Sequence, residues 1–251
     1  MRLFRKNQSS QTEFAAPIAP EAPFYAVGDL HGCDALFERL LIQLEKDAHP
    51  SARFICVGDY VDRGDDSARL LQRLHLLEKS AGGMMVCLMG NHERMLLDFL
   101  DDPPARGFRW QRNGGLQTLA SYGLRGVPET GSETEWVTLS QKLRAKMGED
   151  LVDWLRDLPL HWQSGNVAVT HAGADPELPI KAQGEKELLW GRSGFFNKVR
   201  SDGTWVAYGH IITRKPKAEQ GRIPLDTGAY ATGQLTAALI EPGSVRYIMT
   251  S

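Results

Sequence analysis

The sequence predicts an α/β protein with two β-sheets and a helical region between its two strand-rich parts. In the N-terminal half, an apolar strand, a glycine-rich loop and a helix with leucines at helical spacing recur three times. The middle of the chain has helical patterning without strands. The C-terminal part has short apolar runs separated by turn residues, as strands do. A chain of 251 residues with 42% hydrophobic residues fits one large domain.

The three N-terminal units are expected to form a parallel sheet, because strands alternate with helices. Their strands are predicted at about 24–27, 53–57 and 84–89, and their helices at about 34–46, 66–79 and through Met95, Leu96 and Phe99. In parallel sheets the loops after the carboxyl ends of the strands form the ligand crevice. A ligand site is therefore expected on these three loops.

The stretch at about 101–160 has no metal-ligand candidates and is expected to form a helical cap beside the crevice. Asp102-Pro103-Pro104 breaks the preceding helix. A short helical segment then reaches Tyr122, and 135–158 is predicted as one or two helices. From about His161 the sequence predicts a second, mostly antiparallel sheet, with strands at about 166–170, 205–208, 222–225, 234–241 and 244–249.

The first 23 residues are predicted to be a flexible tail, so that a single domain spans 24–251. This stretch has low hydrophobicity and several prolines. It lacks the continuous apolar segment of a secretory signal, so a cytoplasmic location is expected.

Composition excludes several classes of partner. The net charge of −2 is not that of a nucleic-acid-binding surface, and no apolar run reaches the length of a membrane span. The cysteines Cys33, Cys56 and Cys87 form neither a disulfide framework nor a zinc pattern, which favours a reducing compartment. Cys33 lies beside a motif described below, and we expect a buried or half-buried structural thiol there.

Six short motifs combine metal-ligand residue types with glycines. In order they are Gly28-Asp29-Leu30-His31-Gly32, Gly58-Asp59-Tyr60-Val61-Asp62-Arg63-Gly64, Gly90-Asn91-His92-Glu93, His171-Ala172-Gly173, Tyr208-Gly209-His210 and Asp226-Thr227-Gly228. Each alone is weak, because Asp and Asn often cap helices or begin turns and a histidine after an apolar run is often a core residue. The ordered set points to one site.

The chemistry of the set fits two divalent cations. Carboxylate and amide oxygens suit hard cations, and imidazole suits manganese, iron and zinc. Two aspartates, one asparagine and three histidines are too many ligands for one ion and enough for two. Two ions roughly 3.5–4 Å apart can share a carboxylate and a hydroxide that attacks phosphorus in line. Asp29 and His31 are two residues apart, so in extended backbone they point the same way.

The ordered motifs resemble the PPP family of metal-dependent phosphoprotein phosphatases, within the calcineurin-like metallophosphoesterases. The likeness is greatest to the short bacterial and phage lambda-type members and runs from about Tyr25 to the last strand. It implies two mixed β-sheets packed face to face with helices outside. It also implies two divalent ions, with manganese expected and iron or zinc as alternatives. Asp29 and His31 would hold the first ion, Asp59 would bridge both, and Asn91, His171 and His210 would hold the second.

The resemblance also assigns roles outside this ligand set. His92 resembles the general acid that protonates the leaving oxygen, with Asp62 as the carboxylate that fixes its tautomer. Arg63 is expected to bind two phosphate oxygens, with Asn91 beside it. Arg192, in a Trp-Gly-Arg segment after a predicted apolar strand, resembles a second phosphate clamp; the alternative is an ordinary surface or ion-pairing arginine.

Two further acids have open roles. Glu93 is expected to be structural, because a carboxylate in the first turn of a helix favours the helix dipole. Asp226 either supports the site from behind the ligands or begins a turn. The segment Asn113-Gly114-Gly115 is similar to one in the phage enzymes, which suggests a loop near the site.

The predicted function is a phosphomonoester hydrolase that acts on phosphoserine or phosphothreonine in proteins. The alternative is a bis(5'-nucleosyl)-tetraphosphatase, which uses a related site; the symmetrical enzymes tend to carry alanine at the Asp62 position and aspartate at the Glu93 position. A broad phosphatase of small phosphoesters also fits. An inactive binding module on the same fold would have lost a ligand or the acid, and none is lost here.

Overall fold

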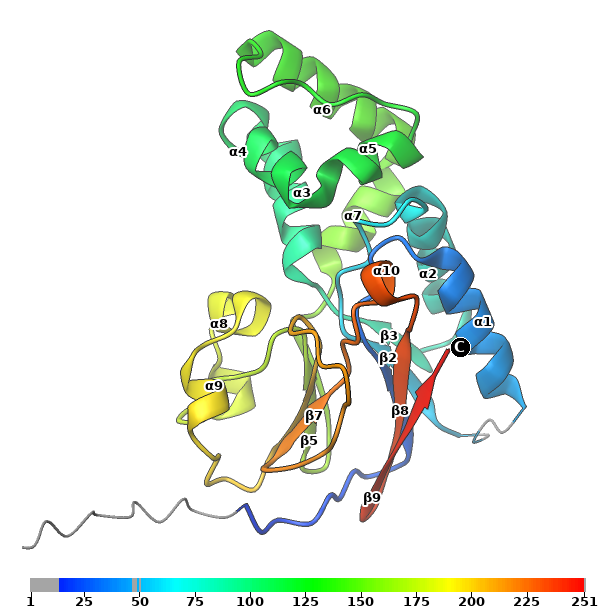
Figure 1. The fold of residues 1–251 in the computed structure, drawn as a ribbon, viewed down its shortest axis with the longest axis vertical. Helices are drawn as coiled ribbons and strands as arrows, with labels where there is room; N and C mark the ends of the chain where they lie inside the picture. Colours follow the sequence, from blue (N-terminus) through cyan, green and yellow to red (C-terminus); the bar gives the residue numbers. More distant parts are fainter. Residues whose placement is uncertain (1–13, 47–48, 50, 251) are drawn as a thin grey trace, which may run out of the picture.

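Two β-sheets pack against each other beneath a group of helices in the computed structural model, which describes residues 14–46, 49 and 51–250 (Figure 1). The elements in chain order are β1 (Phe24–Val27), α1 (Asp34–Glu45), β2 (Arg53–Cys56), α2 (Ser67–Ser80), β3 (Met85–Cys87), α3 (Asn91–Asp101), α4 (Pro103–Trp110), η1 (Gln111–Gly115), α5 (Leu116–Ser121), α6 (Glu133–Met147), α7 (Glu149–Asp157), β4 (His161–Ser164), β5 (Val167–Thr170), η2 (Ile180–Ala182), α8 (Glu185–Trp190), α9 (Gly194–Asn197), β6 (Trp205–Tyr208), β7 (Arg222–Pro224), α10 (Ala229–Thr232), β8 (Thr236–Glu241) and β9 (Ser244–Met249).

The first sheet has five strands in the order β3-β2-β1-β8-β9. The three predicted strand-loop-helix units supply β1, β2 and β3, and these pair in parallel as expected. β8 and β9 extend the same sheet in antiparallel fashion from β1. The sheet is therefore mixed.

The second sheet has four strands in the order β4-β5-β6-β7. Only β4 and β5 are antiparallel; β5, β6 and β7 run parallel. Our expectation of a mostly antiparallel second sheet was wrong in two ways, because β8 and β9 belong to the first sheet and most of the second is parallel. The physical reason is the long connection through α8 and α9, which lets β6 return parallel to β5.

Alternating side chains of β1 divide the core into two layers. Phe24 and Ala26 face the second sheet and pack in a cluster with Val167, Val169 and other apolar residues of both sheets. Tyr25 and Val27 point to the other face, where α1 and α2 pack. This period of two is the pattern of a strand buried on both faces. The sheets thus pack face to face, as the family resemblance implies.

The helical cap comprises α4 to α7 and stands above the sheets in Figure 1. α3 ends at Asp101 and α4 starts at Pro103, so the predicted break falls between them. Trp110 in α4 is fully buried and stacks on Phe99 of α3 with ring centroids 4.8 Å apart. The cap is thereby fixed to the helix that carries the third motif. None of the helices in the described part of the chain could cross a membrane.

Residues 14–23 have no helix or strand, yet they are bound to the second sheet. The Asn166 side chain donates to the carbonyl of Pro17 and accepts the N–H of Ala19, both at 2.8 Å. The ring of Phe14 packs edge-on against Trp205, with centroids 5.0 Å apart. The part of the expected flexible tail at 14–23 is therefore packed: Ile18 is buried in the core between the sheets, and the Asn166 side chain binds the backbone beside it. Residues 1–13 lie outside the described part.

Replacing Asn166 with alanine should lower the free energy of unfolding by about 1–3 kcal/mol, because the three hydrogen bonds of its side chain, to Pro17, Ala19 and Gly203, are lost. Urea unfolding measures this. Gln163→Ala is the control, since its side chain is exposed and bonds only to the nearby Gly165 carbonyl. Equal stability of both variants would show that residues 14–23 are not held by Asn166.

Candidate metal centre

All six motifs follow the carboxyl ends of parallel-running strands, so the two sheets deliver them to one edge. The motif residues after β1, β2, β3, β5, β6 and β7 are respectively Asp29 and His31, Asp59 to Arg63, Asn91 to Glu93, His171, His210, and Asp226. This is the position that open α/β sheets use for ligands. The expected convergence of the first three loops is therefore observed, and loops of the second sheet complete it.

Asp59 lies at the centre of the cluster. Its Oδ2 is 3.4 Å from His31 Nε2, and its Oδ1 is 3.3 Å from His171 Nε2. Two overlapping groups share this carboxylate: His31, Asp59 and His92, and Asp59, His171 and His210. Within each group, atoms able to bind a metal lie within 4.8 Å of one another. One carboxylate between two donor groups is the arrangement that a two-metal site requires.

Asp29 and Asn91 lie within the same cluster. Both carboxylate oxygens of Asp29 accept the His210 N–H, at 3.1 and 3.0 Å. The Asn91 Oδ1 is 2.8 Å from His171 Nε2. Gly209 is required here, because an added Cβ would lie 1.9 Å from Asp29 Oδ1. All six predicted ligands are thus brought together.

The electrostatics of these residues fit bound cations. Burial, together with the charges of Asp226 and Asp59, raises the pKa of Asp29 well above its usual value. Burial lowers the pKa of His31 to about 3 and that of His171 to about 4, so both imidazoles are neutral at pH 7. Crowded carboxylates beside neutral imidazoles are a donor set in which a divalent cation would relieve the repulsion.

Backbone carbonyls orient both neutral imidazoles. His31 Nδ1 donates to the Val61 carbonyl at 2.9 Å, and His171 Nδ1 donates to the Val57 carbonyl at 3.1 Å. Since a carbonyl can only accept, the Nε2 atoms carry the free lone pairs. These lone pairs face Asp59, so both rings present a ligand atom to the cluster.

The site concentrates backbone strain. Among the described residues, those other than glycine with positive φ are His31, Asp59, Asp62, Arg63, His210 and Gln220, and all except Gln220 belong to the motifs. Such conformations cost on the order of 1–3 kcal/mol each and persist where surrounding contacts enforce them. Their clustering supports a functional role independently of residue chemistry.

Glu93 is one of these enforcing contacts. Its buried carboxylate accepts the N–H groups of Asp59 at 2.8 Å, Tyr60 at 2.7 Å and Val61 at 3.1 Å. It also accepts the N–H of Gly90 at 3.0 Å. Glu93 is therefore placed as a structural residue, although its main partners are the loop after β2 and not only its own helix.

His92 differs from His31 and His171, whose pKa values are lowered. Its Nδ1 donates to Asp62 Oδ2 at 2.7 Å. Burial acts to lower its pKa, but the charge of Asp59 and the hydrogen bond to Asp62 outweigh burial and raise it. Its Nε2 lies 3.9 Å from Asp59 Oδ2, on the side of the cluster. The ring can therefore hold a proton beside the cluster, as a general acid must.

Arg63 lies at the rim of the site, and its partner was not predicted from the sequence. Its Nη1 donates to the Tyr230 hydroxyl at 3.1 Å, and its guanidinium carbon lies 4.9 Å from the centre of the Tyr230 ring. The Tyr230 ring also packs edge-on against His31. The Arg63 N–H donates to the Gly114 carbonyl at 3.2 Å, so the Asn113-Gly114-Gly115 segment does lie at the site. Tyr230, two residues after the last motif, was missed.

Arg192 is in a different setting. It forms an ion pair with Asp175, and 48% of its side chain is exposed. The apolar residues before it belong to helix α8, so the strand expected there was wrong. The ion pair fits the alternative that the sequence left open, and a phosphate-binding role for Arg192 stays a prediction.

Asp226 and Cys33 fit their expected places. Asp226 Oδ1 accepts the N–H of Gly228 at 2.7 Å, and its charge acts on Asp29, so it both begins a turn and supports the site. Cys33 is half-buried, and burial raises the pKa of its thiol to about 11. A thiol that stays protonated is a poor metal ligand.

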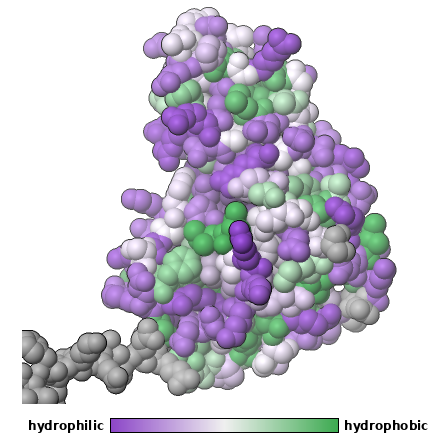
Figure 2. Space-filling view, in the orientation of Figure 1, coloured by the Kyte–Doolittle hydropathy of each residue, from purple (hydrophilic) through white to green (hydrophobic). Residues whose placement is uncertain are grey.

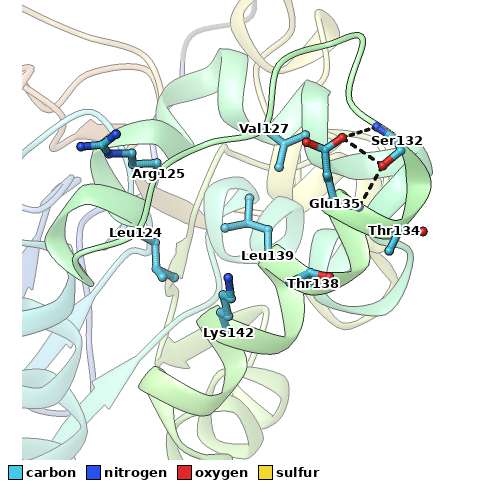
Figure 3. Close-up of a pocket in the computed structure, with 9 residues that line it drawn as sticks. All are labelled: Leu124, Arg125, Val127, Ser132, Thr134, Glu135, Thr138, Leu139 and Lys142. Carbon is cyan, nitrogen blue, oxygen red and sulfur yellow. Dashed lines mark hydrogen bonds between the residues drawn. The ribbon is translucent and has the colours of Figure 1, made fainter.

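The surface shows two further features. Ile211 and Ile212, directly after His210, are both exposed. Figure 2 shows a patch of apolar surface near the middle of the drawn face, bordered by hydrophilic surface. A separate pocket of about 350 Å³ lies in the cap between residues 124–127 and α6 (Figure 3). Its lining contains no motif residue.

Residues 22–214 match the family described as calcineurin-like phosphoesterase, which covers most of the chain. The chain therefore belongs to this family of metallophosphoesterases. Together with the phosphatase relatives below, this makes it an enzyme that hydrolyses phosphoesters.

Relatives of two kinds are similar to the chain. The serine/threonine-protein phosphatase 1 of Salmonella typhimurium is 29% identical over 86% of this chain and 91% of its own length. The symmetrical bis(5'-nucleosyl)-tetraphosphatase of Acidovorax sp. is 32% identical over 61% of this chain, but the match spans only 44% of that protein. The asymmetrical bis(5'-nucleosyl)-tetraphosphatase PrpE of Oceanobacillus iheyensis is 26% identical over 84% of this chain and 86% of its own length.

Solved structures agree on the fold. One described as a candidate diadenosine tetraphosphatase has a TM-score of 0.63 at 22% identity and covers 94% of this chain and 99% of its own. A protein serine/threonine phosphatase from Saccharomyces cerevisiae has a TM-score of 0.56 at 17% identity, covering 94% of this chain and 84% of its own. At these identities the likeness shows the two-sheet fold alone.

Glu93→Ala should lower the free energy of unfolding by at least about 3 kcal/mol, because four backbone N–H groups lose their buried acceptor. Urea unfolding measures the change. Glu135→Ala is the matched control: Glu135 holds the same third position in α6, but it is exposed and bonds only to Ser132. If both variants lost the same small amount of unfolding free energy, Glu93 would be an ordinary carboxylate in the first turn of a helix.

Proposed function

We propose that the chain is a phosphomonoester hydrolase of the serine/threonine protein phosphatase type. The observation that carries the proposal is the buried His92–Asp62 pair, with its 2.7 Å hydrogen bond, beside the ligand set. A serine or threonine alkoxide is a poor leaving group and needs a proton as the ester bond breaks. An imidazole whose pKa is raised by neighbouring carboxylates is suited to hold that proton.

The ligand set would hold two divalent ions: Asp29, His31 and Asp59 on one side, and Asp59, Asn91, His171 and His210 on the other. When bound, such ions supply Lewis-acid polarisation of the phosphoryl group and activation of water, and manganese is the activator we expect. The remaining work falls to the chain's own side chains.

Several side chains would act on the substrate itself. Arg63 would place its paired N–H groups on phosphate oxygens, with Asn91 beside it and Arg192 as a further candidate. As water oxygen bonds to phosphorus, the bond to the seryl oxygen breaks and His92 Nε2 gives its proton to that oxygen. Asp62 holds the ring and stabilises its protonated form.

Hydrolysis of dinucleoside tetraphosphates is the second candidate, and the relatives of that kind support it. There the leaving group is itself a phosphate, which is far less basic than an alkoxide and gains less from a proton donor. The presence of Asp62 behind His92 therefore favours a phosphoprotein as the substrate.

A substrate panel with added manganese tests the proposal. The specificity constant for a phosphoserine or phosphothreonine peptide should exceed that for diadenosine tetraphosphate by at least about tenfold. p-Nitrophenyl phosphate serves as the general phosphoester. The same panel after chelation should show no turnover, and manganese should restore it. A preference for the tetraphosphate would overturn the proposed substrate class and leave the metal-dependent chemistry intact.

His92→Ala should lower kcat by roughly 10²–10⁴ on a phosphoserine peptide, the usual worth of a positioned proton donor. The loss on p-nitrophenyl phosphate should be smaller, because nitrophenolate leaves without a proton. Asp62→Asn should give a milder version of this difference. His75→Ala is the control, since His75 stacks on Trp154 away from the motifs. Equal losses of His92→Ala on both substrates would assign His92 to positioning or metal binding.

A further inference from the structure

The carboxylate of Asp62 is surrounded by hydrogen-bond donors, and two of them come from the cap. The side chain is completely buried. Oδ1 accepts from the Thr118 hydroxyl at 2.7 Å, and Trp110 Nε1 lies 3.1 Å from both oxygens. His92 Nδ1 is the third donor, on Oδ2. Trp110 ends α4 and Thr118 lies in α5, so neither belongs to a motif.

These donors define what Asp62 can do. Indole N–H can only donate, so Trp110 requires Asp62 to accept, as an ionised carboxylate does. A hydroxyl has a single proton, which Thr118 uses on Oδ1. Together Trp110, Thr118 and His92 donate to both oxygens and hold the carboxylate of Asp62 in one orientation. The imidazole then keeps its orientation, with Nε2 toward the ligand set.

Thr118 also fixes the backbone of Asp62. The Asp62 N–H donates to Thr118 Oγ1 at 2.9 Å and to Ser67 Oγ at 3.1 Å. The φ of Asp62 is 72°, in the left-handed region that is uncommon for residues other than glycine. A single hydroxyl therefore contacts both the main chain and the carboxylate of this strained residue. Thr118 is fully buried, which leaves no water to replace it.

We propose that Trp110 and Thr118 are positioning residues of the acid pair, so that the cap takes part in proton transfer as well as covering the crevice. The inference rests on the proposed role of His92 and extends it to residues 48 and 56 positions along the chain from Asp62. Loss of either donor leaves a buried carboxylate partly unsatisfied and free to turn. His92 then loses its fixed orientation, although every ligand to metal stays in place.

The test compares leaving groups in the intact, manganese-loaded protein. Thr118→Val removes the hydroxyl at nearly constant volume, and Trp110→Phe removes the N–H while keeping a ring against Phe99. Each should lower kcat on a phosphoserine peptide by about tenfold, a typical effect of losing an outer hydrogen-bond partner. On p-nitrophenyl phosphate the loss should be smaller, and bound manganese should be unchanged. Thr118→Ser keeps the hydroxyl and should restore the peptide activity.

Trp136→Phe is the matched control, because Trp136 is also buried in the cap and packs on Phe99. It should change stability without changing the ratio of the two rates. An unchanged ratio in Thr118→Val overturns the inference, as does a loss that Thr118→Ser fails to rescue. Should Trp110→Phe not fold, the threonine pair alone decides the outcome. His92→Ala, assayed in parallel, separates failure of this inference from failure of the proposed function. If His92→Ala lost equal activity on the peptide and on p-nitrophenyl phosphate, His92 would not be the proton donor, and the proposed function itself would fail.

Discussion

The buried carboxylate of Asp59 is the constraint on which the rest of the structure depends. It lies between His31 and His171, and its Oδ1 accepts the backbone N–H of His92 at 3.0 Å. Its own backbone is left-handed, with a φ of 54°. Gly90 must be glycine beside it, because an added Cβ would lie 2.2 Å from the Asp59 nitrogen. The loop after β3 can therefore pack closely against the loop after β2, which brings Asn91 and His92 to the centre of the site.

The local environment divides the site histidines into two chemical types. Burial lowers the pKa of His31 and His171, and carbonyl acceptors on Nδ1 leave their Nε2 lone pairs for cations. His92 is buried almost as deeply, but its Nδ1 partner is a carboxylate, and its pKa is raised. The roles proposed for these histidines, ligand or acid, thus follow from whether a carbonyl or a carboxylate lies behind the ring.

The parts that could be predicted from the sequence are those in which chemistry and local spacing coincide. Ligand-type residues beside glycines, after apolar strands, identified Asp29, Asp59 and the late histidines, and the structure brings them together. The pairing of β8 with β1 was not predictable from local pattern, because an apolar strand does not specify its neighbour. Trp110 and Thr118 lie on helices with no motif, and only tertiary contact shows that they reach Asp62. The packing of residues 14–23 was not predicted for a related reason, since the partners of Phe14 and Ile18 and the side chain of Asn166 lie far along the chain from them.

Anomalous diffraction from crystals of the protein grown with manganese tests the central role of Asp59 most directly. The account predicts two manganese peaks about 3.5–4 Å apart, with the Asp59 carboxylate bound to both, His31 on one side and His171 on the other. His92 should bind neither ion and should keep its hydrogen bond to Asp62. A single peak, two peaks that do not share Asp59, or a bond from His92 to manganese would contradict the account.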